Sequence, residues 1–185
     1  MLHAPRATHR RRRGLTLIEV LIAVVVLVAA LTAFIRSLTG TVQLGRANRE
    51  SSLAMEGARR TIEELYAADF AQVFALYNSR TDDDPVPDAP GASFAVATLE
   101  AQEGDADGFV GEIRFPTVGA GPLLELREDI ADDALGMPRD LDGANGIDAF
   151  EHSVDYRYLP VEVRVRWKGR SGEKELTLKT VLVDK

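Results

Sequence analysis

Cysteine is absent from the sequence, and histidine occurs only three times. The missing cysteine excludes disulfide frameworks, thiol nucleophiles and cysteine-based zinc sites. Beyond the first fourteen residues the only histidine is His152, and a single histidine beside acids is more often a surface residue than half of a catalytic pair. Ser171 lies in Gly-Arg-Ser-Gly, which lacks the glycine spacing of a nucleophile elbow. We therefore expect that the protein is not an enzyme.

Basic residues are scarce outside the first fourteen positions. The 185 residues include 22 Lys and Arg and 29 Asp and Glu, for a net charge of −7, and five of the arginines lie in residues 1–14. Residues 15–185 therefore carry a charge of −12. So acidic a body argues against nucleic-acid binding, because phosphate neutralisation needs a basic surface. The length suits one folded domain with accessory segments.

A run of 21 residues, Leu15 to Ile35, contains only three polar side chains: Thr16, Glu19 and Thr32. A helix of this length spans about 30 Å, the thickness of a bilayer's hydrocarbon core. The arginines in front of it would hold its N-terminal end in the cytoplasm and place the rest of the chain across the membrane. Glu19 needs a compensating partner, because inserting a carboxylate into lipid costs a few kcal/mol.

Residues 14–23, Gly-Leu-Thr-Leu-Ile-Glu-Val-Leu-Ile-Ala, closely resemble the processing motif of type IV prepilins and type II secretion pseudopilins. The resemblance implies that a prepilin peptidase removes the leader 1–14 by cutting after Gly14 and methylates the new N-terminus at Leu15, where the family most often has Phe. It also implies that Glu19 pairs with the terminal amine of a neighbouring subunit during assembly. The implied partners are this peptidase, other pilin or pseudopilin subunits and an inner-membrane assembly platform. The Arg-rich leader and acidic domain suggest a minor subunit.

The helical pattern continues from residue 36 to residue 78 without proline. Small and apolar side chains recur at helical intervals and predict a stripe that packs on a sheet; its members are Ala47, Ala54, Ala58, Ile62 and Leu65. Gly40, Gly45 and Gly57 are weak points in this helix. We expect residues 69–78 to form either its last turn or a separate short helix.

Residues 79–185 are predicted to form a globular domain. Its first segment, 79–91, reads as a loop with three prolines and an acidic run. Strands are predicted at 93–99, 110–115 and 123–127, followed by an antiparallel hairpin over about 156–184 in which Val161, Val163, Val165 and Trp167 alternate with charged residues. The hairpin's charged face should lie in water and its apolar face on the helix stripe. The predicted class is α+β, a type IV pilin-like fold with a long N-terminal helix packed on a small antiparallel sheet.

The acidic stretch 129–151 offers one candidate metal site. Its Asp, Asn and Gly residues resemble a calcium loop, although they fail the EF-hand spacing. Some major pseudopilins bind calcium near their C-terminal strands, so calcium is the one cofactor suggested, with Asp140, Asp142, Asn145 and Asp148 as candidate ligands. The alternative is a flexible solvated loop in which these residues satisfy turn geometry.

These patterns favour a prepilin-like structural subunit of a type IV pilus or type II secretion pseudopilus. It would lie in the inner membrane, with its N-terminus in the cytoplasm and its C-terminal domain in the periplasm, and then enter the filament. One alternative is an uncut, membrane-anchored extracytoplasmic binding module. Another is a secreted hydrolase behind a signal peptide, a less suitable reading because the apolar run is longer than a signal peptide's.

Overall fold

The computed structural model describes residues 16–170 and 172–184. The chain divides into two compact units, residues 1–45 and residues 46–185. The helix α1 runs from Leu17 to Ala67 and contributes to both units. The predicted cleavage and methylation residues, Gly14 and Leu15, lie outside the described residues.

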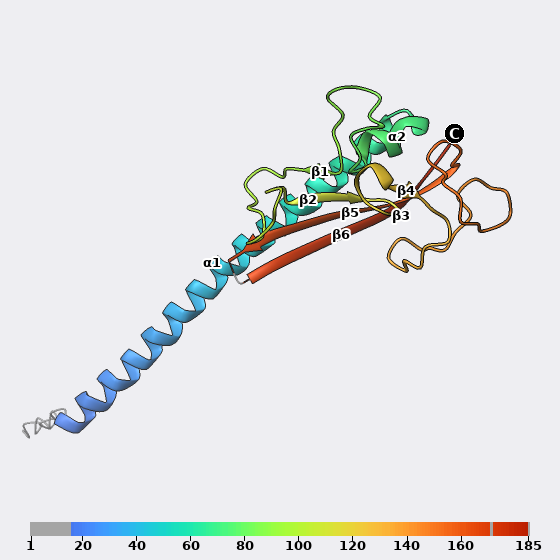
Figure 1. Ribbon diagram of the computed structural model, residues 1–185. Helices are drawn as coiled ribbons and strands as arrows, with labels where there is room; N and C mark the ends of the chain where they lie inside the picture. The colour runs from blue at the N-terminus through green and yellow to red at the C-terminus, as the bar shows by residue number, and fades with distance from the viewer. Residues whose placement is uncertain (1–15, 171, 185) are drawn as a thin grey trace, which may run out of the picture. The chain divides into compact units, whose positions relative to one another are not determined.

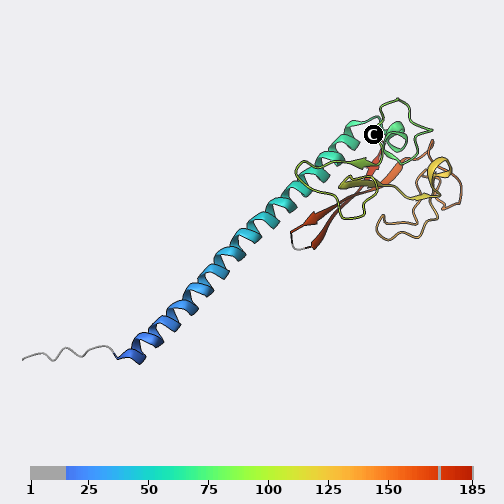
Figure 2. The ribbon, with the colours of Figure 1, turned by 60° about the vertical axis from the view of Figure 1, so that its left-hand side comes forward.

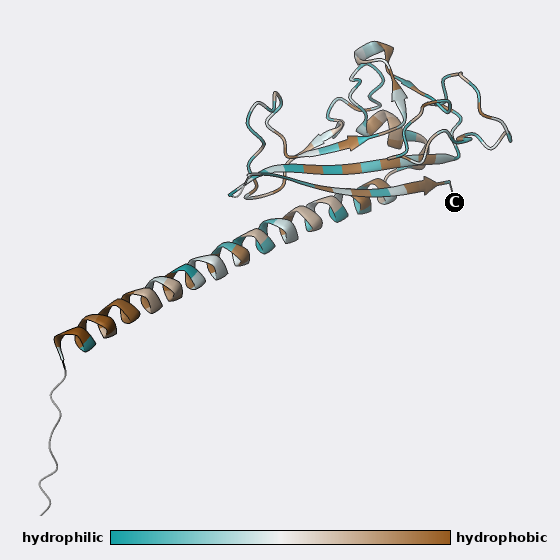
Figure 3. Cartoon of the chain, turned by 90° about the horizontal axis from the view of Figure 1, so that it is seen from below, coloured by the Kyte–Doolittle hydropathy of each residue, from teal (hydrophilic) through white to brown (hydrophobic). Residues whose placement is uncertain are grey.

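The first unit contains the apolar front part of α1, which is coloured brown in Figure 3. Every residue from Thr16 to Thr39 is exposed. This segment is long and apolar enough to cross a membrane. The predicted long N-terminal helix is therefore present, with its apolar side chains uncovered on all sides.

The second unit is built on a four-stranded sheet (Figure 1). Its strands, in spatial order, are β1 (Ser93–Phe94), β2 (Gly111–Arg114), β5 (Tyr158–Gly169) and β6 (Gly172–Val183). All neighbours pair antiparallel, and β5 and β6 form the predicted hairpin (Figure 2). A second, two-stranded sheet joins β3 (Thr117–Val118) to β4 (Glu125–Leu126).

The rear part of α1 packs on one face of the larger sheet. Ala54, Ala58, Thr61 and Leu65 are its buried residues, while Ile62 is partly buried against the core. On β5 the alternating apolar residues are buried, as expected for a strand with one face on a helix. A hydrogen bond of 2.8 Å between the hydroxyls of Tyr66 and Thr180 also joins α1 to β6. The predicted α+β fold is confirmed.

A separate short helix, α2 (Phe70–Tyr77), follows α1. The carboxylate of Asp69 accepts the backbone N–H of Ala71 and so caps the new helix. Phe74 packs edge-on against Phe115 at a ring distance of 5.4 Å. Of the two expectations for residues 69–78, a last turn or a separate helix, the structure has the second.

The first and third predicted strands are shorter than expected. The segment 93–99 keeps only Ser93–Phe94 as strand, because Thr98 adopts a positive φ of 69° and Val96 turns towards α1. A Cβ at Gly57 would lie 2.6 Å from Cγ2 of Val96, so this glycine makes room for the turn. The segment 123–127 begins in a 3₁₀ turn and pairs with β3, a strand that was not predicted.

The charged face of the hairpin is not wholly in water as predicted. Glu162 on β5 is 1% exposed. Its carboxylate accepts hydrogen bonds from Arg114 on β2, at 3.3 Å, and from Arg164, at 2.6 Å. A buried carboxylate of this kind is stable only because it is paired.

Candidate assembly segment and acidic loop

The first candidate site is the start of α1, where Glu19 occupies the first helical turn. Thr16 precedes the helix, and its hydroxyl accepts the backbone N–H of Glu19 at 3.3 Å. The four residues Thr-Leu-Ile-Glu are thus a capping-box sequence, in which the hydroxyl satisfies one of the free N–H groups of the first turn. A negative charge is also favoured at this end of a helix. The capping-box sequence also marks this helix start, a signal that the resemblance to the processing motif does not depend on.

Glu19 stands among exposed apolar side chains. The nearest basic residue that follows it is Arg36, seventeen positions along the helix, or about 25 Å away. A carboxylate in an apolar layer needs an opposite charge close to it. The described helix therefore presents an acid whose compensation must come from outside residues 17–35 of the same chain.

The second candidate site is the acidic loop, residues 128–157, and its centre is Glu128, which is 1% exposed. One carboxylate oxygen accepts the backbone N–H groups of Leu141 and Asp142, and the other accepts that of Asp148 at 3.2 Å. These donors come from two separate parts of the loop. Glu128 therefore fixes the path of the loop from its interior.

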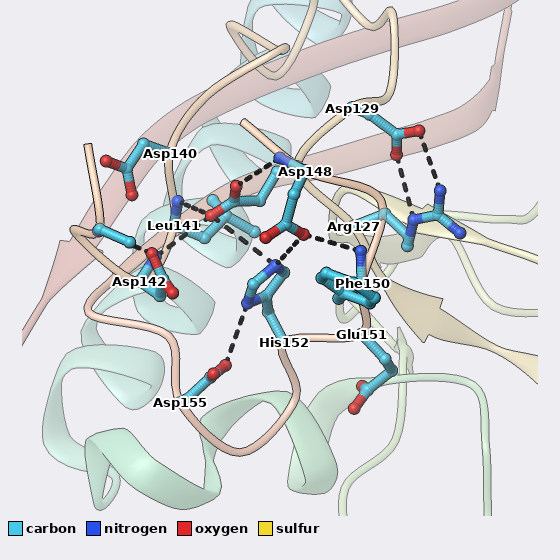
Figure 4. Close-up of polar contacts among 12 residues, drawn as sticks. Arg127, Asp129, Asp140, Leu141, Asp142, Asp148, Phe150, Glu151, His152 and Asp155 are labelled. Atoms are coloured by element: carbon cyan, nitrogen blue, oxygen red, sulfur yellow. Dashed lines mark hydrogen bonds and ion pairs between the residues drawn. The ribbon is translucent and has the colours of Figure 1, made fainter. Parts of the chain in front are cut away.

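His152 lies next to Glu128 and is 3% exposed, so the prediction of a surface histidine was wrong. Figure 4 shows its ring between two carboxylates. Nε2 lies 3.2 Å from Asp148, and Nδ1 lies 3.1 Å from Asp155. Nε2 is also 3.9 Å from an oxygen of Glu128.

The surroundings of His152 favour its charged form. Burial opposes the charge, but the hydrogen bonds to Asp148 and Asp155 and the charge of Glu128 outweigh it and raise the pKa of His152 above its ordinary value. The pKa of Asp148 is lowered, chiefly because its carboxylate accepts the N–H of Phe150, with His152 adding to the effect. His152 and the carboxylates of Glu128, Asp148 and Asp155 therefore form one network of charged groups within the loop.

Three of the four predicted calcium ligands, Asp140, Asp142 and Asp148, fall into different groups of acidic and histidine side chains. Ligand atoms of Asp140 and Asp142 lie within 4.8 Å of each other and of Glu128, whereas Asp148 groups with Glu128 and His152. The backbone N–H of Asn145 donates to Asp140 at 2.7 Å, and Asn145 has a positive φ of 64°. Backbone hydrogen bonds from Gly143 and Asn145 outweigh desolvation and lower the pKa of Asp140.

Each group supplies three side chains, whereas Ca²⁺ takes six to eight oxygen ligands, so a calcium ion here would need further oxygens from the backbone or from water. Turn geometry accounts for the bonds that Asp140 and Asp142 accept from their own loop. Calcium binding by these residues stays a prediction, which a comparison of the melting temperature with and without a chelator tests.

The sequence reading missed Glu128 and His152 as the residues that organise the loop. No local signal in the sequence marks them, because a buried ionisable residue is identified by the segments that close over it and not by its neighbours in the chain. Only the abundance of Asp and Gly around them indicated a turn-rich region.

Comparison with known proteins supports the reading of the N-terminal segment. Residues 9–35 match the family model described as the prokaryotic N-terminal methylation motif. The match includes Gly14, Leu15 and Glu19 and confirms, over this segment, the resemblance to type IV pilins and pseudopilins. No curated protein and no solved structure matches the chain.

Proposed function

We propose that this chain is a structural subunit of a type IV pilus or type II secretion pseudopilus. The observation that carries the proposal is the methylation motif at residues 9–35, which lies directly in front of and within an exposed apolar helix. In this proposal a prepilin peptidase cuts after Gly14 and methylates Leu15. The peptidase performs the reaction, and the chain itself is a building block.

Cleavage at this bond would supply the charge that Glu19 needs. The new amine at Leu15 lies one residue before the helix cap at Thr16. Methylation of an amine keeps its positive charge, so a methylated terminus can still pair with a carboxylate. Pairing between the amine of one subunit and Glu19 of its neighbour would neutralise both groups inside the apolar layer and set the register of the two helices.

The exposed front part of α1 would pack against the same part of other subunits. Its apolar side chains are uncovered over the whole range from Leu17 to Leu38. Lipid covers such a surface while the subunit waits in the inner membrane, and neighbouring helices cover it in a filament. The globular unit would then stand on the periplasmic side, because the arginines of the leader favour the cytoplasm.

The test is the mass and N-terminal sequence of the protein recovered from its native membrane. We expect an N-terminus at Leu15 that carries one extra methyl group. A Gly14→Val variant, which changes only the residue before the predicted bond, should keep the whole leader. An intact leader on the unchanged protein would instead favour the uncut membrane-anchored module, and a terminus beyond Ala30 would indicate a signal peptide.

A further inference from the structure

Part of the acidic loop exposes apolar side chains beside exposed acids and buries two polar residues, Glu128 and His152. Phe150 is 73% exposed and Val154 is 90% exposed, and Ile147 is exposed as well. His152, between them in sequence, is buried together with Glu128. These three apolar side chains are exposed within eight residues, and a group of exposed apolar side chains marks a surface that another molecule covers.

Hydrogen bonds hold the backbone of the segment that carries Phe150. The N–H of Phe150 donates to Asp148 at 2.7 Å, and the N–H of Asp148 donates to Glu128. The backbone N–H of His152 donates to the carbonyl oxygen of Leu126 on β4 at 3.0 Å. The backbone at Phe150 is therefore held in position, which reduces the ordering of the loop that a partner would have to impose.

The neighbouring turn carries further exposed apolar residues. Leu126, which His152 contacts, pairs with Thr117 on β3. Val118 follows on the same strand, and Leu123 lies in the turn between β3 and β4; both are exposed. We call the exposed apolar residues of these two segments the loop-end surface; they are Val118, Leu123, Ile147, Phe150 and Val154.

The loop-end surface is set in an acidic part of the chain. Residues 117–157 contain ten Asp and Glu and three Lys and Arg, a charge of −7, which equals that of the whole sequence. Arg127 is already paired with Asp129 at 2.9 Å, as Figure 4 shows, and with Glu125 at 3.4 Å. The charge that faces a partner is therefore negative.

We propose that the loop-end surface docks a different protein, one that offers an apolar patch bordered by Lys or Arg. The apolar residues supply the buried area, and the acidic surroundings select the sign of the partner's charge. A second copy of the same surface would bring like charges together, and a membrane with anionic lipids would be repelled. A protein surface that is apolar and bordered by basic residues matches both the exposed apolar residues and the acidic charge around them.

The experiment places a photo-crosslinking residue, p-benzoylphenylalanine, at position 150 of the full-length protein in the cells that make it. We expect crosslinks to a protein other than this chain, at a peptide in which Lys or Arg lies beside apolar residues. The matched control is Phe109, which is also exposed and whose N–H donates to Asp107 at 2.9 Å, in the same Asp-x-Phe arrangement. The replacement at 109 should not crosslink to that protein.

A charge reversal tests the electrostatic part. Glu151→Lys should lower the crosslink yield from position 150 by at least about threefold. The proposal is overturned by crosslinks at 150 to a second copy or to lipid, by a partner peptide without basic residues, by equal yields at 150 and 109, or by no crosslink. An uncut leader would count against the proposed function and not against this surface, so the two can fail separately.

Discussion

Glu162 of β5 and Arg114 of β2 form an ion pair across neighbouring strands, with Nη1 of the arginine 3.3 Å from the carboxylate. The pair lies on the face of the sheet opposite α1, and Glu162 is buried there. Glu162 also binds Arg164 of its own strand. One carboxylate thus holds two arginines.

Replacing Glu162 by Ala should lower the free energy of unfolding by about 2–3 kcal/mol. The effect should stay below that of a fully buried pair, because Arg114 and Arg164 are partly exposed and can be hydrated again. Chemical denaturation of the full-length protein in detergent measures the change. The control is Glu175→Ala, an exposed partner of the same Arg164 at 3.9 Å, which should cost less than about 1 kcal/mol. Equal effects would contradict the structural role of Glu162.

Glu128→Ala should loosen the acidic loop from its interior. The change leaves three backbone N–H groups, those of Leu141, Asp142 and Asp148, without their acceptor. We expect a loss of about 3 kcal/mol in stability. Hydrogen exchange should show faster exchange at Leu141 and Asp148, while the amides of β5 keep their protection. Asp129→Ala, at an exposed acid one position along the chain, should leave the exchange of these amides unchanged.

The stability of the globular unit should depend on pH through His152 and Asp148. The pKa of His152 is raised, so its contribution is present below its ordinary pKa of 6.5 and is lost as the pH rises through the raised value. The pKa of Asp148 is lowered, so its contribution is present above 3.8 and is lost as the pH falls through the lowered value. The melting temperature should therefore be highest between these limits. In His152→Gln the decline on the alkaline side should flatten, and an unchanged slope would show that His152 does not cause it.

Asp155→Asn offers a milder test of the same network. It removes the charge of the group that lies 3.1 Å from Nδ1 of His152 but keeps an oxygen at that position. The pKa of His152, followed by NMR of its ring protons, should fall relative to the unchanged protein, because one of the charges that raise it is gone. A pKa that stays the same would mean that Asp148 and Glu128 account for the whole effect.

Gly57→Ala tests the close approach of Val96 to α1. Alanine favours a helix over glycine by about 1 kcal/mol, but its Cβ would overlap Val96 and add about 1–3 kcal/mol of strain. We expect a net loss of stability in the unchanged background. In a Val96→Ala background the overlap is gone, so the same change should stabilise by up to about 1 kcal/mol. Equal effects of Gly57→Ala in both backgrounds would contradict the contact.

Glu19→Ala separates a filament subunit from a simple anchor. An anchor should insert into the membrane at least as well without the carboxylate, whereas a subunit should lose incorporation into filaments because the partner of the terminal amine is missing. Isolation of filaments and quantification of the protein in them measures this. Thr32→Ala is the matched control, since the Thr32 hydroxyl donates to the carbonyl oxygen of Val28 of its own helix at 2.8 Å. Full incorporation of both variants would contradict the proposed role of Glu19.

The main elements were predictable from the sequence because their patterns are long. The alternation from Val161 to Trp167 predicts a strand with one buried face, and the stripe through Ala54, Ala58 and Leu65 predicts the buried side of α1. The short strands were not predictable to the residue. Whether Val96 continues β1 or turns onto Gly57 depends on space at the helix surface, which no local pattern records.

Of the two candidate sites, the N-terminal motif was predictable from the sequence and the interior of the acidic loop was not. Gly14, Leu15 and Glu19 belong to a contiguous motif, so the sequence displays them together, although the first two lie outside the described residues. Glu128 and His152 are 24 positions apart in the sequence and become neighbours only when the loop folds. The choice of Asp140, Asp142, Asn145 and Asp148 followed composition, and composition does not reveal which carboxylate is turned inwards.

The connectivity of the large sheet also implies an order of folding. The turn Gly169–Gly172 brings β5 and β6 together over a few residues, while Arg114 and Glu162, which join β2 to β5, are 48 positions apart. Since each doubling of a closed loop costs about 0.6 kcal/mol in chain entropy, the hairpin should form well before β2 docks. β5, the strand with the most buried residues, thus has one edge paired early, which shortens the time in which it could pair with another chain while the distant segments are still unfolded.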